Sequence, residues 1–345
     1  MLLTIAAGVT VYLSTRPDGQ AGADPAPTTS PAAPTSIAPP APAVAVPSIG
    51  ATVPVGETPG YVAAAPNGRQ LYIANRDVGV VTVVDTAVNR VTATIPIDAG
   101  PPQFIAFSPD GRRAYVSVWN EERTIAAVSV LDTTENSVVE TIPVETRPFL
   151  PAVSPDGKWV YVPNHDTDSV SVIDASSHEL VTSIEVAPNP HWVAFTPDGS
   201  KVYTANHDSN VVSAIDPATT TVTTTIPVPT SPHSIAVHPT RPILIVATYD
   251  ADSASVIDTR TDALLATIPV GRFPQHAAWS ADGRFAYITN NEDDSISVID
   301  AETFAVTATI PTGTSPTSFA VLPDGTRGYV TNLRDGTLTE LDLAG

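Results

Sequence analysis

The feature of this sequence that most constrains its fold is a unit of 42 to 46 residues that recurs seven times. In the last copy, Pro316 precedes an apolar segment, the turn Pro323–Gly325 follows, and Tyr329–Asn332 leads through a polar loop to a segment that ends at Asp342. The turn position is occupied in successive copies by Gly68, Gly111, Gly157, Gly199, Arg241, Gly283 and Gly325. A period of this length is typical of repeat architectures, in which each copy forms one structural unit.

Each copy predicts four β-strands, because runs of Val, Ile, Thr and Tyr are broken by Pro, Asn, Asp and Gly. In the fourth copy these strands are His191–Phe195, Lys201–Asn206, Val211–Asp216 and Thr221–Val228. The fourth strand carries a proline in every copy except the one with Glu185. Proline lacks the N–H group that a central strand needs, so we expect this strand at an outer edge.

The two ends of the repeat region predict a closed ring. The last copy stops after its third strand, whereas the region begins with an unpaired segment, Gly50–Val55, that has the character of a fourth strand. Joining the two removes the open edges that an incomplete ring would leave. The sequence therefore predicts an all-β fold: a seven-bladed β-propeller of four-stranded blades over residues 48–345, closed by the N-terminal strand completing the last blade.

The segment before the repeats predicts export or membrane anchoring. Leu2–Leu13 is apolar, and it is shorter than the roughly 20 residues that a spanning helix needs but within the range of a signal-peptide core. We therefore expect residues 1–20 to be a signal or a partial membrane anchor. Residues 21–47 are rich in Pro, Ala and Thr and almost uncharged, which is typical of a disordered linker. The expected location is extracytoplasmic, either secreted or anchored to the cell membrane.

The composition excludes several classes of function. The chain has 36 acidic and 16 basic residues, a formal net charge of −20, which argues against nucleic acid as a partner. It has no cysteine, so thiolate metal sites, thiol catalysis and disulfides are excluded. No Gly-x-Ser-x-Gly, His-Glu-x-x-His or glycine-rich phosphate loop is present.

Tyr329–Asn332 has close relatives in the other copies, at Tyr72–Asn75, Tyr161–Asn164, Tyr203–Asn206 and Tyr287–Asn290. On these motifs the sequence resembles the YVTN-repeat β-propeller family over roughly residues 50–343. The resemblance implies a propeller scaffold and no particular reaction, because one fold hosts many functions. An apolar N-terminus, a proline-rich spacer and a propeller together also resemble the outer part of actinobacterial membrane sensors.

One face of the expected propeller carries the richest chemistry. Because consecutive strands alternate in direction, the loops that precede the first strand and follow the second strand of each copy lie on the same face. The residues that we expect to line a funnel there, and to bind a ligand, are Arg76, Trp119, Arg147, His165, His191, His207, His233, Tyr249, Arg272 and His276. The Tyr repeated in the second strand is expected to pack between blades.

Three interpretations of this face remain open. Its aromatic and arginine residues would suit recognition of a cell-envelope protein, peptide or glycan. Its histidines could instead hold a divalent metal, with His191, His233 and His276 as candidate ligands, as in propeller-type lyases, lactonases and copper propellers. The third interpretation is that the histidines share a face by chance. The function we favour is an extracytoplasmic binding or sensor module without a cofactor; the alternative is a metal-assisted lyase or lactonase-like hydrolase on the same face.

Two acidic loops, Asp166–Asp168 and Glu292–Asp294, present oxygen ligands of the kind that calcium prefers. They lack the spacing and the glycine of an EF-hand loop. We therefore expect these carboxylates to serve as turn residues instead.

Overall fold

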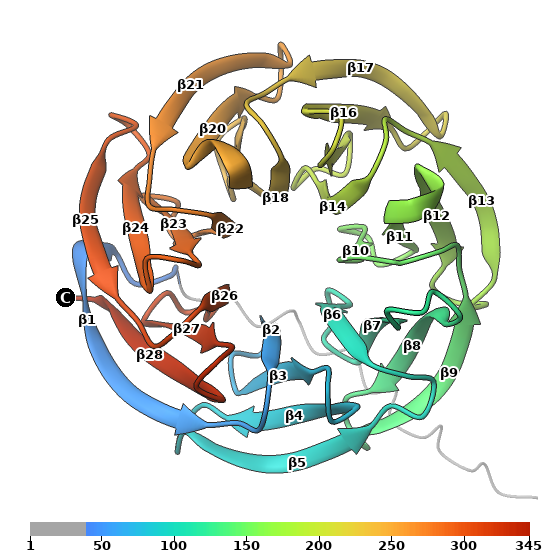
Figure 1. Ribbon diagram of the computed structural model, residues 1–345, viewed down its shortest axis with the longest axis horizontal. Helices are drawn as coiled ribbons and strands as arrows, with labels where there is room; N and C mark the ends of the chain where they lie inside the picture. Colours follow the sequence, from blue (N-terminus) through green and yellow to red (C-terminus); the bar gives the residue numbers. More distant parts are fainter. Residues whose placement is uncertain (1–38) are drawn as a thin grey trace, which may run out of the picture. The chain divides into compact units, whose positions relative to one another are not determined.

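The computed structural model describes residues 39–345, which form a ring of seven antiparallel sheets, each of four strands (Figure 1). The innermost strands are β2 (Pro59–Ala64), β6 (Pro102–Phe107), β10 (Ala152–Val153), β14 (Pro190–Phe195), β18 (Pro232–Val237), β22 (Pro274–Trp279) and β26 (Pro316–Val321). The second strands are β3 (Gln70–Asn75), β7 (Arg113–Trp119), β11 (Trp159–Asn164), β15 (Val202–Asn206), β19 (Ile243–Thr248), β23 (Phe285–Asn290) and β27 (Arg327–Asn332).

The third strands are β4 (Val80–Asp85), β8 (Ala126–Asp132), β12 (Ser169–Asp174), β16 (Val211–Asp216), β20 (Ser253–Asp258), β24 (Ser295–Asp300) and β28 (Thr337–Ala344). The outermost strands are β5 (Arg90–Pro96), β9 (Ser137–Pro143), β13 (Leu180–Glu185), β17 (Thr221–Pro227), β21 (Ala263–Pro269), β25 (Val306–Pro311) and β1 (Ala43–Pro54). Two short 3-10 turns, His165–Thr167 and Tyr249–Ala251, follow β11 and β19. We number the blades one to seven from the blade that contains β2.

The predicted fold class is confirmed. The six proline-bearing strands and their proline-free counterpart β13 are the outermost strands of their blades, as the missing N–H of proline requires. The ring closes as expected, because β1 pairs antiparallel with β28 and completes the seventh blade with β27 and β26 (Figure 1). The strand β1 begins at Ala43, earlier than the predicted domain start at residue 48: Ala43 pairs with Ala344, and its N–H donates to Asp282 at 2.8 Å.

The core lies between the blades. The middle two strands of each blade are almost wholly buried, whereas the outer strands alternate between exposed and buried residues. The repeated tyrosines fill these interfaces, as predicted, and Tyr72, Tyr203 and Tyr287 have no exposed surface. The hydroxyl of Tyr203 in blade four reaches Asp262 in blade five at 2.6 Å, so the ring also links adjacent blades by hydrogen bonds.

The predicted signal or anchor segment at residues 1–20, and the part of the predicted linker up to residue 38, lie outside the described residues. Within residues 39–345, none of the helices has the length and apolar character needed to cross a bilayer.

Candidate functional site

The innermost strands place two consecutive residues of each repeat near the axis. In β2, β6, β14, β18 and β22 the pairing register shifts immediately after the first proline, as between Pro190 and Trp192. Such a β-bulge re-aims a side chain that would otherwise alternate to the opposite face. The residues one position after the prolines form a first ring, which consists of Gly60, Gln103, Phe149, His191, His233, Gln275 and Thr317. The residues one position further form a second ring, which consists of Tyr61, Phe104, Leu150, Trp192, Ser234, His276 and Ser318.

The first ring surrounds a cavity of about 230 Å³, which we call the funnel. All seven first-ring residues line it, with Tyr61, Phe104 and Trp192 from the second ring. Arg76, Trp119, Glu121 and Arg147 complete the wall from the loops at the same face. The funnel therefore combines aromatic walls, two guanidinium groups and one carboxylate.

Arg76 is a cation without a partner at the mouth of the funnel. Its side chain is half-buried, and no hydrogen bond or ion pair to its guanidinium occurs within residues 39–345. Burial lowers the pKa of Arg76, against the opposing charges of Asp77 and Glu121. Gly60 makes room for this side chain, because a Cβ at residue 60 would lie 2.9 Å from Nη2 of Arg76. A desolvated arginine of this kind favours an anionic ligand.

Arg147 supplies the second cation, held flat against aromatic rings. Its guanidinium carbon lies 4.8 Å from the ring centroid of Trp119 and 5.6 Å from that of Phe149. It also lies 3.7 Å from Asp166, measured from Nη1 to Oδ1. The indole Nε1 of Trp119 is buried and has no hydrogen-bond partner among the described residues. This part of the wall therefore combines a positive charge with aromatic surface.

Four histidines form a contiguous stack beside these groups. The ring centroid of His191 lies 4.7 Å from that of His165, 4.5 Å from that of His207 and 4.7 Å from that of His233. Phe149 stacks on His191 at 4.2 Å, and Tyr249 stacks on His233 at 5.5 Å. Of the three histidine contacts, His191 and His207 are stacked at an interplanar angle of 18°, whereas His165 is tilted by 41° and His233 stands edge-on at 85°.

The imidazoles at the centre of the stack are neutral at physiological pH. Burial, followed by the nearby His233, His207 and His165, holds the pKa of His191 well below its usual range. Burial and His207 lower the pKa of His233 to about 4. Nδ1 of His233 donates to the carbonyl oxygen of Gln275 at 3.0 Å, which leaves Nε2 as a hydrogen-bond acceptor. Nδ1 of His191 has no partner.

His276 belongs to the second ring and joins two blades. Its Nδ1 accepts the backbone N–H of Phe319 at 3.0 Å. Ser234 and Ser318 use the same position in the same way, accepting the N–H groups of Ala277 and Val62. Burial lowers the pKa of His276 to about 3, which keeps the imidazole neutral and Nδ1 able to accept. Nδ1 of His276, the nitrogen that could bind a metal, is thus already engaged in a hydrogen bond within the fold.

The loops around the funnel are fixed by a repeated contact. The last loop residue before the third strand accepts a backbone N–H from the following blade: Asp168 from Asn189 at 3.0 Å, and Asp294 from Ser315 at 2.8 Å. These two residues belong to the acidic loops, and their turn role agrees with the prediction. Asp293 in the second loop binds Arg272 at 2.6 Å, so this arginine lies beside the loop and not in the funnel wall.

The structure brings most of the predicted site together. Arg76, Trp119, Arg147, His191 and His233 line the funnel directly, and His165, His207 and Tyr249 stack against them. The remaining two, Arg272 and His276, are engaged elsewhere. Among residues 39–345 no group of three or more His, Asp or Glu side chains has the geometry to hold a metal ion.

Nine lining residues are not among the ten predicted: Gly60, Tyr61, Gln103, Phe104, Glu121, Phe149, Trp192, Gln275 and Thr317. Tyr61, Phe104 and Trp192 depend on the bulge, which leaves no mark in the sequence beyond the proline. Glu121 reaches the funnel from the loop Asn120–Ile125 of the longest repeat, and the spacing of 46 residues between Gly111 and Gly157 is the signal that could have indicated it.

The fold is that of a seven-bladed propeller with a cavity near its axis. The family model described as "Lactonase, 7-bladed beta-propeller" matches residues 84–186 and 174–269, which together make up more than half of the chain. The chain therefore belongs to this family, and the propeller part of the predicted resemblance is confirmed.

Among solved structures, one similar chain is described as Kuenenia stuttgartiensis hydrazine synthase. It is 23% identical, the match covers 84% of this chain and 96% of that one, and the TM-score is 0.76. At this identity the likeness shows the shared fold. Among curated proteins, none matches this chain.

Proposed function

We propose that this protein is an extracytoplasmic binding module that takes a small carboxylate-bearing ligand, such as the free end of a cell-envelope peptide, in the funnel. The observation that carries the proposal is the half-buried guanidinium of Arg76, which lines the funnel without a partner among the described residues. A guanidinium presents paired N–H donors that match a carboxylate. Arg147 adds a second positive charge to the wall of the funnel.

The rest of the funnel suits an organic anion better than a metal or an inorganic ion. Its walls are largely aromatic, with Tyr61, Phe104, Phe149 and Trp192 around the cavity. Neutral imidazoles do not compete with Arg76 for the anion. Because the loops are tied to neighbouring blades, little ordering cost accompanies binding.

The test is a titration of the full chain with benzoate, followed by the fluorescence of Trp119 and Trp192. Benzamide serves as the neutral probe of the same shape. The proposal expects saturable quenching by benzoate, weaker binding of benzamide, and a loss of about tenfold or more in benzoate affinity for Arg76→Gln, since a charge-assisted bond contributes about 1.5–3 kcal/mol. Arg76→Gln should fold normally, because the guanidinium has no partner to lose.

Arg334→Gln is the matched control. Arg334 is exposed in another loop, where it lies 3.8 Å from Glu292, so its replacement removes one charge without touching the funnel wall. Equal weakening in both variants would show that overall charge attracts benzoate, and benzoate binding that survives Arg76→Gln unchanged would refute the proposal.

A second candidate function, hydrolysis of a lactone, is favoured by the family match and by one feature of His233. The bond from its Nδ1 to Gln275 leaves Nε2 unprotonated, as a general base requires. In that reaction His233 would take a proton from water as the water attacks the ring carbonyl, and Arg76 would stabilise the oxyanion. The tetrahedral intermediate would then collapse with cleavage of the ring C–O bond, and His233 would return the proton to the leaving oxygen, which gives the hydroxy acid. With dihydrocoumarin as the substrate, we expect the protein to release acid, measured as the consumption of added base, and we expect His233→Gln to lose this activity. A hydrolysis rate equal to that in buffer alone would rule out hydrolysis of this probe.

The extracytoplasmic location is a proposal that rests on the sequence of residues 2–47. It expects the protein in the secreted or membrane fraction of its cells. Immunoblotting of separated fractions tests it, and recovery with the cytoplasmic fraction alone would contradict it.

A further inference from the structure

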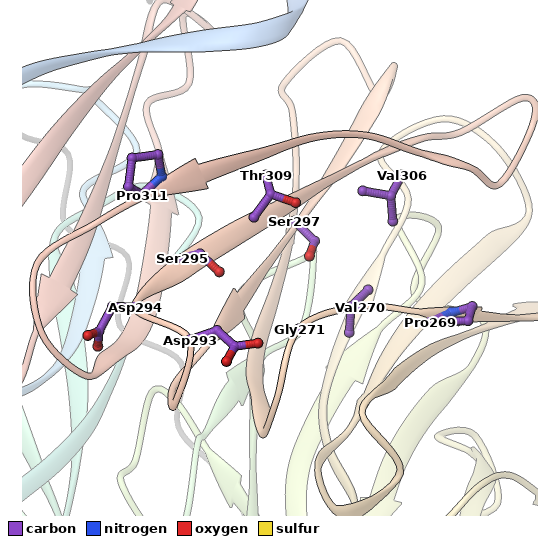
Figure 2. Close-up of a pocket in the computed structure, with 10 residues that line it drawn as sticks. All are labelled: Pro269, Val270, Gly271, Asp293, Asp294, Ser295, Ser297, Val306, Thr309 and Pro311. Carbon is purple, nitrogen blue, oxygen red and sulfur yellow. The ribbon is translucent and has the colours of Figure 1, made fainter.

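A groove on the outer side of blade six has no part in the funnel. It has a volume of about 550 Å³ and lies between the end of β21 and the strands β24 and β25 (Figure 2). Its lining residues, which define the blade-six groove, are Pro269, Val270, Gly271, Asp293, Asp294, Ser295, Ser297, Val306, Thr309 and Pro311.

In blade three, the position that corresponds to the blade-six groove is filled by the side chain of Glu145. Glu145 follows Pro143 by two residues there, as Gly271 follows Pro269. Its carboxylate accepts hydrogen bonds from Ser169 and, at 2.6 Å, from Ser183. Burial raises the pKa of Glu145, but these hydroxyl bonds outweigh it and hold the pKa below its usual value. The hydroxyls of this position therefore bind an oxygen acceptor.

In blade six the hydroxyls remain but the acceptor is missing. Ser295 and Thr309 occupy the register positions of Ser169 and Ser183, and Gly271 contributes no side chain. Ser295 and Ser297 accept from the Asn290 amide at 3.1 and 3.0 Å. Within residues 39–345, no hydrogen bond donated by the hydroxyl of Ser295, Ser297 or Thr309 occurs. Ser295 is 5% exposed and Ser297 2% exposed, so the donors of these two serines are held on the floor of the groove.

Two acidic residues beside the groove of blade six change the class of ligand that fits there. Thr167 of blade three is replaced by Asp293, and the carboxylate of Asp293 is paired with Arg272 at 2.6 Å. Asp294 has no ion-pair partner among the described residues, although one of its oxygens accepts the N–H of Ser315. A carboxylate guest would meet this uncompensated charge. The guest must accept from Ser295 and Thr309 and donate to Asp293 or Asp294.

We propose that the blade-six groove binds a neutral polyhydroxylated ligand, one or two sugar units of a glycan. A hydroxyl group donates and accepts through one oxygen, which suits a groove where the acceptors Asp293 and Asp294 stand beside the donor Ser295. Pro269, Val270, Val306 and Pro311 provide aliphatic surface for the C–H faces of a sugar ring. The volume is within the range of small-ligand sites.

The test is saturation-transfer NMR on the full chain with three probes: cellobiose, maltose and N,N′-diacetylchitobiose. Transfer to at least one disaccharide is expected. Thr309→Val should weaken its binding about fivefold, since one neutral hydrogen bond contributes about 1 kcal/mol, and the double variant Ser295→Ala/Thr309→Val should abolish transfer. Ser183→Ala is the matched control, because Glu145 fills the groove that it lines.

Three results would overturn the proposal: transfer to none of the disaccharides, transfer that persists in the double variant, or transfer to N-acetylglutamine amide in place of the sugars, which would indicate a peptide site. Arg76→Gln should leave sugar binding unchanged. A negative result for sugar binding in the blade-six groove can therefore be distinguished from a negative result for carboxylate binding in the funnel.

Discussion

The hydrogen bonds between blades give a sharp test of what holds the ring together. Tyr203→Phe removes the hydroxyl that donates to Asp262 at 2.6 Å and keeps the buried ring. A bond to a charged acceptor contributes about 1.5–3 kcal/mol. Asp262 keeps Lys201 at 2.8 Å, so it is not left unpaired, and we expect the lower end, about 1.5 kcal/mol. With an unfolding entropy of about 2.1 cal/mol/K per residue, that is a fall of about 2 °C in Tm for a domain of this size.

Tyr287→Phe is the matched control in the same register. The hydroxyl of Tyr287 is buried but has no hydrogen-bond partner among the described residues. Removing an unsatisfied hydroxyl should leave Tm unchanged or raise it slightly. Calorimetry of both variants at pH 7 measures the difference. An equal loss in the two variants would refute the reasoning, since it would assign the effect to packing and not to the bond.

Two further predictions concern single contacts. Asp294→Ala should lower stability by about 1–2 kcal/mol through loss of the Ser315 N–H bond, and Asp294→Asn by less; equal losses in urea unfolding would contradict this. The folded pKa of His276 is about 3 and its unfolded value about 6.5, so its contribution to stability is full above pH 6.5 and is lost as pH falls towards 3. His276→Gln should therefore flatten the decline in Tm between pH 6.5 and 4, and an unchanged slope would refute the assignment.

The architecture could be predicted because it rests on positions that repeat. The prolines of the outer strands, the buried tyrosines and the turn glycines each have one physical role that all copies share. Ring closure followed from counting strands at the two ends of the repeat region. The start of β1 was missed because residues 43–47 look like linker and become a strand only through contacts with Asp282 and Ala344.

The site was only partly predictable, because a register position does not determine what a side chain contacts. Arg272 and Arg76 were both predicted to line the funnel, yet Arg272 binds the nearby Asp293 and Arg76 faces the funnel. His276 looks like the other histidines, but the bulge turns it towards the N–H of Phe319. These outcomes depend on which neighbour from the adjacent blade lies within reach.

The central inference is that Arg76 and Arg147 hold a carboxylate in the funnel, and a crystal of the full chain soaked with 4-iodobenzoate tests it most directly. The iodine marks the ligand by its anomalous signal, independently of any assumed pose. We predict a peak within the aromatic walls of the funnel, with the carboxylate against the guanidinium of Arg76, and no peak there in Arg76→Gln crystals. An empty funnel at saturating ligand, or an equal peak in the variant, would contradict the account.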